Sequence, residues 1–388
     1  MYNKMIYLNA SAGTKPYPEV IETIDDVLTN HWGNASSDDS FGRDAKIIID
    51  NVTKQVANDI SCNEDELIWT SGACEANSLA IRGVLEANDG MVLCTTKLEH
   101  TSIEMQTYST PLGVVYELTN SEQGFIDLDN LEKIMKEISL RFWKPLVSVC
   151  YANSEIGVIQ DIKSISEIVH RYGGILHVDA TQLYPWHKIN VQELGIDLMS
   201  VSGQKLHCVK GIGFLYVRNG ITLKPLVYGS QQRERRGGSY PTHLIAAFGK
   251  ALELTRRQCN VSTFVKNLKN YLLECLLHVE GIHLNGPLTD KWRLPNNISL
   301  TIDGVKAETL TTMCDLMGVI IAKGSACKSY EATPSKALLA IGLTPEQALS
   351  TVRISLDEFN TLEEVNEAAD IITQLVERIR SDEQNKNT

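Results

Sequence analysis

The chain contains 388 residues, which at about 150 residues per domain corresponds to two or three domains. Hydrophobic residues make up 43% and charged residues 22%, a composition that excludes a disordered chain, a collagen-like chain and a small disulfide-stapled protein. Asp and Glu number 48 against 36 Lys and Arg, so the net charge is −12. Because an acidic surface repels phosphate backbones, direct nucleic-acid binding is not expected.

Nine cysteines are scattered along the chain, an odd number with no CxxC pair. This pattern fits neither a disulfide framework nor a structural zinc site, so no bound metal is predicted. No apolar run approaches the length of about 18 residues that a membrane helix needs, and the opening MYNKMIYLNASAG lacks the apolar core of a signal peptide. We expect a cytoplasmic protein without membrane contact.

The middle of the chain alternates short apolar runs with amphipathic stretches, which is typical of βα repeats around a mostly parallel sheet. Strands are predicted at 66–72, 90–96, 146–152, 175–180, 198–203 and 213–218, and helices at 75–88, 126–139 and 162–173. From about residue 260 the pattern changes and indicates a smaller α+β domain. Its elements are a helix at 262–280, strands at 282–286 and 296–303, a helix at 307–318 and an extended segment at 319–327.

The segment TSGACEAN (70–77) carries a strand through Ser71 and Gly72 into a helix that begins near Glu75. Free backbone N–H groups at the start of a helix bind anions such as phosphate, and a glycine lets the anion approach closely. Taken alone, the motif more often marks an ordinary turn between a strand and a helix.

Two further strand ends carry chemically informative residues. Asp179 ends the apolar strand of HVDATQ, where its carboxylate needs a cation or a strong donor, such as a protonated pyridine nitrogen. Lys205 follows the next strand in SGQK, and a lysine amine on rigid structure can attack a carbonyl and form a Schiff base. Such an aspartate is more often a helix cap, and a lone lysine is usually solvated. An anion site, an aspartate and a lysine in this order are together what a pyridoxal 5′-phosphate (PLP) site requires.

With these motifs in place, the chain resembles the NifS/IscS-type cysteine desulfurases, PLP-dependent enzymes of the class V aminotransferase family. The resemblance extends from YLNASAG (7–13) to TVRISLDEFNTLEEV (351–365). Its most specific motifs are TSGACEAN, NSEIGVIQDI (153–162), HVDATQ, SGQK, RRGGSYP (235–241) and GSACKS (324–329). GSACKS carries the most weight, because it separates the desulfurases from the aminotransferases of the same fold.

The resemblance implies a PLP-dependent transferase of fold type I, in the α/β class. Its large PLP-binding domain, residues 16–260, would hold a mainly parallel seven-stranded sheet flanked by helices. Residues 1–15 and 261–388 would form the smaller α+β domain with the loop of the catalytic cysteine. A homodimer is also implied.

The resemblance assigns the cofactor contacts as well. Lys205 would bind PLP covalently and move protons at the substrate α-carbon, Asp179 would pair with the pyridine nitrogen, and Gln182 would contact the phenolic oxygen. His100 would stack on the ring face and also move protons. The remaining positions would border the phosphate: Ala73, Cys74, Ser202, Gln204 and, from a second subunit, Ser239.

The substrate contacts follow in the same way. Asn153 and Arg353 would bind the carboxylate of L-cysteine, Arg353 through two charge-assisted hydrogen bonds. A thiolate at Cys327 would take the substrate sulfur, leaving a persulfide on the enzyme and L-alanine, and Lys328 would favour the thiolate form. The persulfide would pass to an acceptor protein for iron–sulfur clusters, tRNA thiolation or DNA phosphorothioation. The other eight cysteines are expected to be small buried side chains.

Four positions depart from the family pattern. Gln204 replaces a histidine, whereas Cys74 and Ser239 replace threonines, and all three border the phosphate. A thiol is a poor hydrogen-bond donor, so a weaker grip on the cofactor is predicted. Asn9 replaces an expected aspartate. The departures indicate a divergent branch that retains activity.

Two alternatives stay open at this point. An aminotransferase or a selenocysteine lyase of the same fold would keep the cofactor without needing Cys327. A non-catalytic scaffold paralogue would keep only the fold and dock partners.

Two other clusters receive a structural interpretation. Arg233, Arg235 and Arg236 are interpreted as a solvated charge run. His207 and Cys208 are interpreted as core residues, because no further metal ligand lies at a suitable spacing.

Overall fold

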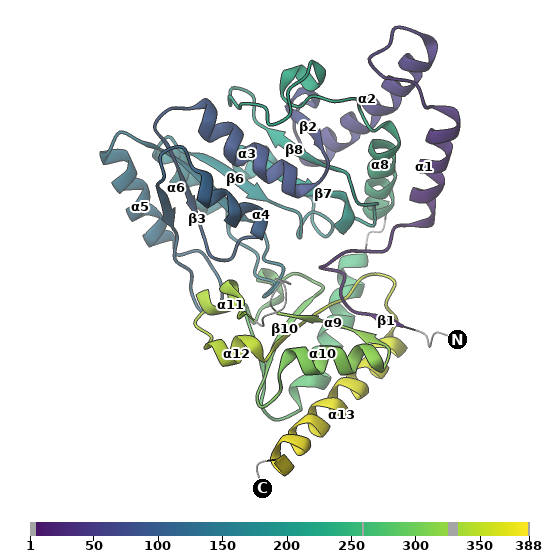
Figure 1. Ribbon diagram of the computed structural model, residues 1–388, viewed down its shortest axis with the longest axis vertical. Coiled ribbons are helices and arrows are strands. Elements are labelled where there is room, and N and C mark those ends of the chain that lie inside the picture. Colours follow the sequence, from purple (N-terminus) through teal and green to yellow (C-terminus); the bar gives the residue numbers. More distant parts are fainter. Residues whose placement is uncertain (1–4, 258–259, 325–332, 387–388) are drawn as a thin grey trace.

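The computed structural model describes residues 5–257, 260–324 and 333–386, and its larger part is built on one central sheet (Figure 1). The seven strands of this sheet lie in the order β2-β8-β7-β6-β5-β3-β4. β8 is antiparallel to both of its neighbours, and the other pairs are parallel. The predicted seven-stranded, mainly parallel sheet is confirmed. The strands are β2 (Leu67–Thr70), β3 (Met91–Thr95), β4 (Val115–Glu117), β5 (Lys144–Cys150), β6 (Ile175–Asp179), β7 (Leu198–Ser202) and β8 (Gly213–Val217).

Helices cover both faces of the sheet, because side chains that alternate along the strands leave an apolar surface on each side. In β3, Val92 and Cys94 join the core of one face, whereas Met91 and Leu93 join the core of the other. The first face is covered by α1 (Pro18–Asn30), α2 (Ser40–Ile60), α5 (Leu128–Leu140), α6 (Ile162–Arg171) and α8 (Thr242–Arg257). The second face is covered by α3 (Ala73–Ala87) and α4 (Thr101–Glu104).

Local signals set the helix boundaries. The side chain of Asp127 accepts hydrogen bonds from two backbone N–H groups at the start of α5, and that of Asp161 accepts one at the start of α6. α3 begins at Ala73, two residues before the predicted start, directly after Gly72 with its φ of +143°. α7 (Val191–Leu194) ends at Gly195 in the left-handed conformation.

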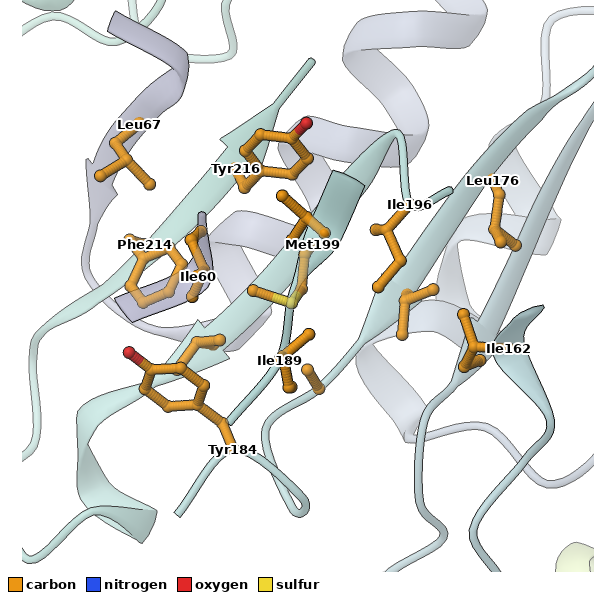
Figure 2. Packing of buried hydrophobic residues seen from close by; sticks show 14 of the residues in the cluster. Ile60, Leu67, Ile162, Leu176, Tyr184, Ile189, Ile196, Met199, Phe214 and Tyr216 are labelled. Atoms are coloured by element: carbon orange, nitrogen blue, oxygen red, sulfur yellow. The ribbon is translucent and has the colours of Figure 1, made fainter. Parts of the chain in front are cut away.

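The core beneath β7 and β8 is rich in aromatic residues. Figure 2 shows Phe214 and Tyr216 of β8 packed with Met199 of β7 and with Tyr184, whose ring lies 5.8 Å from that of Phe214. Burying each such side chain contributes roughly 1.5–3 kcal/mol. This packing makes a rigid support for the residues at the end of β7.

The smaller part, at the bottom of Figure 1, has its own core around a four-stranded antiparallel sheet in the order β12-β13-β10-β9. β1 pairs with β11 in a separate two-stranded sheet, which brings the N-terminal segment to this core. The strands are β1 (Ile6–Tyr7), β9 (Ile282–Leu284), β10 (Asn297–Ile302), β11 (Val319–Ile320), β12 (Ala322–Lys323) and β13 (Thr351–Ser355). The helices are α9 (Val261–Leu277), α10 (Ala307–Leu316), α11 (Lys336–Ala340), α12 (Pro345–Leu349) and α13 (Leu362–Lys386).

Within the described residues, no helix is both long and apolar enough to cross a membrane.

Candidate active site

The predicted site residues gather at one edge of the central sheet, where the parallel strands β2, β6 and β7 end. β6 ends at Asp179, and β7 ends at Ser202, just before the turn that carries Lys205. β2 leads through Gly72 into α3, and a Cβ added to Gly72 would lie 3.6 Å from Ser202 Oγ. The structure therefore brings the three sequence motifs together.

The Asp179 carboxylate is buried and held by neutral donors. Its Oδ2 accepts a hydrogen bond of 2.8 Å from Asn77 Nδ2, and its Oδ1 accepts one of 3.0 Å from the backbone N–H of Thr181. Within the described part of the chain, no basic side chain lies within 4.0 Å of it. A buried carboxylate that has only neutral hydrogen-bond donors around it can still pair with a cationic group supplied by a ligand.

Lys205 is a half-buried amine close to two other site charges. Its Nζ donates a hydrogen bond of 2.7 Å to the carbonyl of Ala12. Burial, together with the Arg353 guanidinium, lowers the pKa of Lys205 from its usual 10.5 to about 8, although the Asp179 carboxylate acts in the opposite direction. A substantial fraction of the amine is therefore neutral, and nucleophilic, slightly above neutral pH.

His100 is the exposed N-cap of α4. Its Nδ1 accepts a hydrogen bond of 3.1 Å from the backbone N–H of Ser102 and lies 2.8 Å from Ser102 Oγ. Ser102 Oγ also accepts a hydrogen bond of 2.9 Å from Asn77 Nδ2, the group that binds Asp179. His100 and Asp179 are thus linked through two polar side chains.

The start of α3 offers the features of an anion site. Ala73 and Cys74 occupy the first helical positions, whose backbone N–H groups have no partner within a helix. Gly72 adopts a φ of +143°, and Ser202 Oγ lies next to it. Cys74 is exposed, so the expectation that it is a buried core residue is wrong, because the helix presents this position outward. Of the other cysteines described, Cys94, Cys150, Cys208 and Cys314 are buried, whereas Cys62 and Cys275 are half-buried.

Arg353, on β13, reaches the site from the smaller part of the molecule. Its Nη2 donates to Asn9 Oδ1 at 3.0 Å and its Nη1 to the carbonyl of Ser154 at 3.5 Å, while its buried Nε has no hydrogen-bond partner among the described residues. Burial lowers the pKa of the guanidinium, but the group stays charged. In the described residues no carboxylate lies within 4.0 Å of it. An arginine that lacks an ion pair in the chain is suited to binding an anionic ligand.

Asn153 is buried and largely engaged in shaping the loop after β5. Its Nδ2 donates to the carbonyl of Leu98 at 2.7 Å, and its Oδ1 accepts from the backbone N–H groups of Glu155 and Ile156 at 2.8 and 2.9 Å. One N–H of the amide remains for a ligand. Burial raises the pKa of the neighbouring Glu155 to about 7, and Ser335 donates a hydrogen bond to its carboxyl group.

The N-terminal segment borders the site on one side. Gln182 Nε2 donates to the carbonyl of Ser11 at 3.2 Å, and the carbonyl of Gln204 accepts from the backbone N–H and the hydroxyl of Thr14 at 3.1 and 3.0 Å. Ser239 lies on an exposed stretch of the loop before α8. Cys327 and its neighbours 325–332 lie outside the described residues.

The three arginines of residues 233–236 are engaged within the chain. Arg233 pairs with Asp65 at 2.8 Å, Arg235 donates to the carbonyl of Asp65 at 2.6 Å, and Arg236 pairs with Glu75 at 2.8 Å. The interpretation as a solvated charge run holds for Arg233, whose side chain is 68% exposed. It is wrong for Arg235 and Arg236, which are half-buried against a carbonyl and a carboxylate.

His207 and Cys208 are 5% and 2% exposed, which confirms their interpretation as core residues. His207 Nδ1 lies 2.8 Å from the carbonyl of Lys15. In the part of the chain that is described, no three His, Cys, Asp or Glu side chains group together as metal ligands would.

Sequence reasoning missed Asn77, Ser102 and the half-buried Glu99 near Asp179. Asn77 lies within the TSGACEAN motif. Its signal in the sequence is that it is a polar residue on an otherwise apolar helix face. Glu99 gave no signal beyond its position next to His100. Burial and the Asp179 carboxylate raise the pKa of Glu99 to about 8, although a hydrogen bond from Thr96 opposes them.

Comparisons with known proteins agree with this geometry. The family model described as Aminotransferase class-V matches residues 6–367. The Cysteine desulfurase IscS of Dictyoglomus turgidum is 34% identical over 385 residues, covering 97% of this chain and 95% of the relative. A solved structure titled NIFS-LIKE PROTEIN has a TM-score of 0.88 at 26% identity, covering 96% of this chain and 99% of its own. A structure titled SspA in complex with cysteine has a TM-score of 0.79 at 26% identity, covering 92% and 100%.

This chain belongs to the class-V aminotransferase family. Members of that family that are cysteine desulfurases depend on PLP, and the residues at this sheet edge fit PLP. Among the described residues Asp179 lacks a cationic partner, Lys205 has a partly neutral amine, and the start of α3 has no side-chain cap that would compete with an anion. These features correspond to the pyridine nitrogen, the aldehyde and the phosphate of PLP.

Proposed function

We propose that the chain works as a PLP-dependent cysteine desulfurase that converts L-cysteine and a Cys327 thiol into L-alanine and a Cys327 persulfide. The observation that carries the proposal is that two charged side chains, the buried Asp179 and the half-buried Arg353, lie at one site with only neutral partners in the described chain. One matches the cofactor's cationic nitrogen and the other matches the carboxylate of an amino acid.

The cofactor is held by residues from three strand ends. When bound, PLP supplies an aldehyde that reacts with amines and a ring that withdraws electrons from the substrate α-carbon. Asp179 keeps a proton on the pyridine nitrogen, Gln182 contacts the phenolic oxygen, and His100 covers a ring face. The phosphate contacts are Ala73, Cys74, Ser202, Gln204 and, from a second subunit, Ser239.

The substrate is oriented by its carboxylate. Arg353 Nε, which has no partner in the described ranges, supports a two-pronged contact, while Asn153 contributes its remaining N–H. The Lys205 amine takes the proton from the α-carbon, which its lowered pKa favours because the neutral form is accessible near pH 8.

Sulfur transfer is assigned to Cys327, which lies outside the described residues. Its thiolate bonds to the substrate sulfur as the C–S bond breaks, and the electron pair of that bond stays on the carbon skeleton. That carbon then takes up a proton and is released as L-alanine. His100 is the exposed group best suited to deliver protons on this side.

The assembly is proposed to be a homodimer of two-domain subunits, with residues 16–260 as the large domain and residues 1–15 and 261–388 as the small one. Exposed aromatic residues support the dimer: Trp32 is 65% exposed and stacks on Phe41, which is 52% exposed. Ser239 is also exposed, as a residue that reaches a neighbouring subunit must be. The protein is proposed to be cytoplasmic and to pass its sulfur to an acceptor protein for iron–sulfur clusters, tRNA thiolation or DNA phosphorothioation, without binding nucleic acid itself.

The test measures alanine and sulfide formed from L-cysteine in the presence of a thiol reductant, by the wild type and by Cys327→Ala. We expect the wild type to turn over and the variant to lose sulfide release. Turnover retained by Cys327→Ala would instead identify an aminotransferase or a selenocysteine lyase. A PLP absorption band that is absent from the wild type, or unaffected by Lys205→Ala, would favour a non-catalytic scaffold.

A further inference from the structure

We propose that Ser102 is a positioning residue for the reaction: its hydroxyl holds the His100 ring in the tautomer that carries its hydrogen on Nε2. The inference rests on the role proposed above for His100. It follows from four hydrogen bonds that join His100, Ser102, Asn77 and Asp179 in one chain.

The direction of these hydrogen bonds begins at Asp179. An ionised carboxylate only accepts hydrogen bonds, so the Asn77 group facing Asp179 Oδ2 at 2.8 Å must be the NH₂. The second hydrogen of the same NH₂ points to Ser102 Oγ at 2.9 Å. Flipping the Asn77 amide would place its oxygen against the carboxylate, which is unfavourable.

The hydroxyl of Ser102 therefore receives a hydrogen bond from Asn77 and has its own hydrogen available. That hydrogen points to His100 Nδ1, 2.8 Å away. The backbone N–H of Ser102 donates to the same nitrogen at 3.1 Å. With two donors directed at it, Nδ1 must present its lone pair, and the ring hydrogen lies on Nε2.

One unsatisfied atom supports a functional role for this chain of hydrogen bonds. Asn77 is 0% exposed, and its Oδ1 is buried without a hydrogen-bond partner in the part of the chain that the structure describes. A buried acceptor without a partner is costly and requires an explanation. Here both N–H groups of Asn77 are committed, one to the carboxylate of Asp179 and one to the hydroxyl that orients His100.

The consequence for the reaction concerns the exposed edge of His100. A neutral ring with hydrogen on Nε2 offers a donor at its free nitrogen, so it meets the reacting groups first as a hydrogen-bond donor rather than as a base. Removing the Ser102 hydroxyl leaves only the weaker backbone contact to Nδ1. The ring then populates both tautomers and more orientations.

The experiment compares Ser102→Ala with Ser102→Thr, which keeps a hydroxyl, and with Thr101→Ala as a neighbouring control. The holoenzyme is labelled with ¹⁵N in its histidines, and the His100 signals are assigned by their absence from His100→Gln. We expect Ser102→Ala to lose the single Nε2–H pattern and to turn over about five- to tenfold more slowly, with an altered pH profile. Ser102→Thr should recover both readouts, and Thr101→Ala should change neither.

Each contrary result has its own meaning. A wild-type ¹⁵N pattern in Ser102→Ala, or equal effects in Thr101→Ala, would overturn the role of Ser102. Unchanged turnover in His100→Gln would overturn the role of His100 and, with it, the relevance of its tautomer, while leaving the Cys327→Ala test of the overall function unaffected.

Discussion

Two ion pairs of the scaffold differ from the charged side chains at the candidate active site. In the scaffold, Arg256 pairs with Asp59 through two hydrogen bonds of 2.9 and 3.1 Å, and Lys269 pairs with Asp290 at 2.7 Å. At the site, Asp179 is held by an amide and a backbone N–H, with no ion pair in the described chain.

The Arg353 guanidinium, like the Asp179 carboxylate, is held by neutral groups, since its partners are an amide oxygen and a backbone carbonyl. A neutral partner fixes the position of a charge without neutralising it. In these examples the scaffold charges are neutralised within the chain, whereas the site charges keep their field for a ligand. Neutral partners alone do not mark a site, because the buried Arg293 of the scaffold also donates only to carbonyl and amide oxygens.

The sharpest test of this comparison exchanges one aspartate of each kind for asparagine. Asp179→Asn removes the charge facing the cofactor nitrogen, and we expect turnover to fall on the order of 10²–10³-fold with little change in stability. Asp59→Asn leaves Arg256 unpaired, and we expect the free energy of unfolding to fall by about 3–5 kcal/mol with turnover retained. Steady-state kinetics and chemical denaturation measure the two quantities. A large loss of stability in Asp179→Asn would contradict the comparison.

The second test removes the site cation. Arg353→Gln deletes a charge-assisted contact to the substrate carboxylate, so kcat/KM for L-cysteine should fall roughly 10–100-fold. Arg353→Lys should recover part of the loss, because a lysine keeps the charge but not the two-pronged geometry. The free energy of unfolding should hold or rise, because no ion pair is broken. An unchanged KM would count against the assigned contact.

A third test concerns His177, which lies beneath the site on β6 and is 0% exposed. Its two ring nitrogens lie 2.8 and 2.9 Å from the hydroxyls of Ser148 and Ser200, and burial lowers its pKa to about 4. Since an unfolded histidine titrates near 6.5, the unfolded chain binds more protons between about pH 6.5 and pH 4, and the stability falls across that window as the pH falls. We expect a loss of about 2 kcal/mol at pH 5.

Urea denaturation at pH 7 and pH 5 measures this loss. The comparison with His177→Asn, which cannot titrate, isolates the contribution of the ring. An equal fall in both proteins would show that other groups cause it.

The smallest expected effect concerns the rate at which the PLP-free protein takes up PLP. With the pKa of Lys205 at about 8, the neutral amine fraction rises about fivefold between pH 7 and pH 8 and less than about twofold above that. Absorption spectroscopy follows the uptake. Arg353→Gln should move the plateau to higher pH, because the guanidinium helps to lower the pKa of Lys205. A rate that climbs steadily to pH 10 would indicate an ordinary solvated lysine.

Much of the fold and part of the site could be predicted from the sequence. The six strands predicted in the middle of the chain and the two predicted after residue 280 are all present, with boundaries that match within two residues, because short apolar runs between turn residues are local signals. β4 and the long helices α1, α2, α8 and α13 were not singled out. Asp179 and Lys205 were predicted to follow successive strands, and in the structure the two strands are neighbours that end at the same edge of the sheet.

The sequence by itself determined which functional groups follow the strands and in what order: an anion-binding turn, then an aspartate, then a lysine. Each of them is set by its local pattern of residues. Only the tertiary structure decided which charges were left without partners. Asn77 meets Asp179 across 102 positions of the chain, and Asn9 meets Arg353 across 344. Such contacts depend on how helices and strands pack, and no local pattern of residues encodes that.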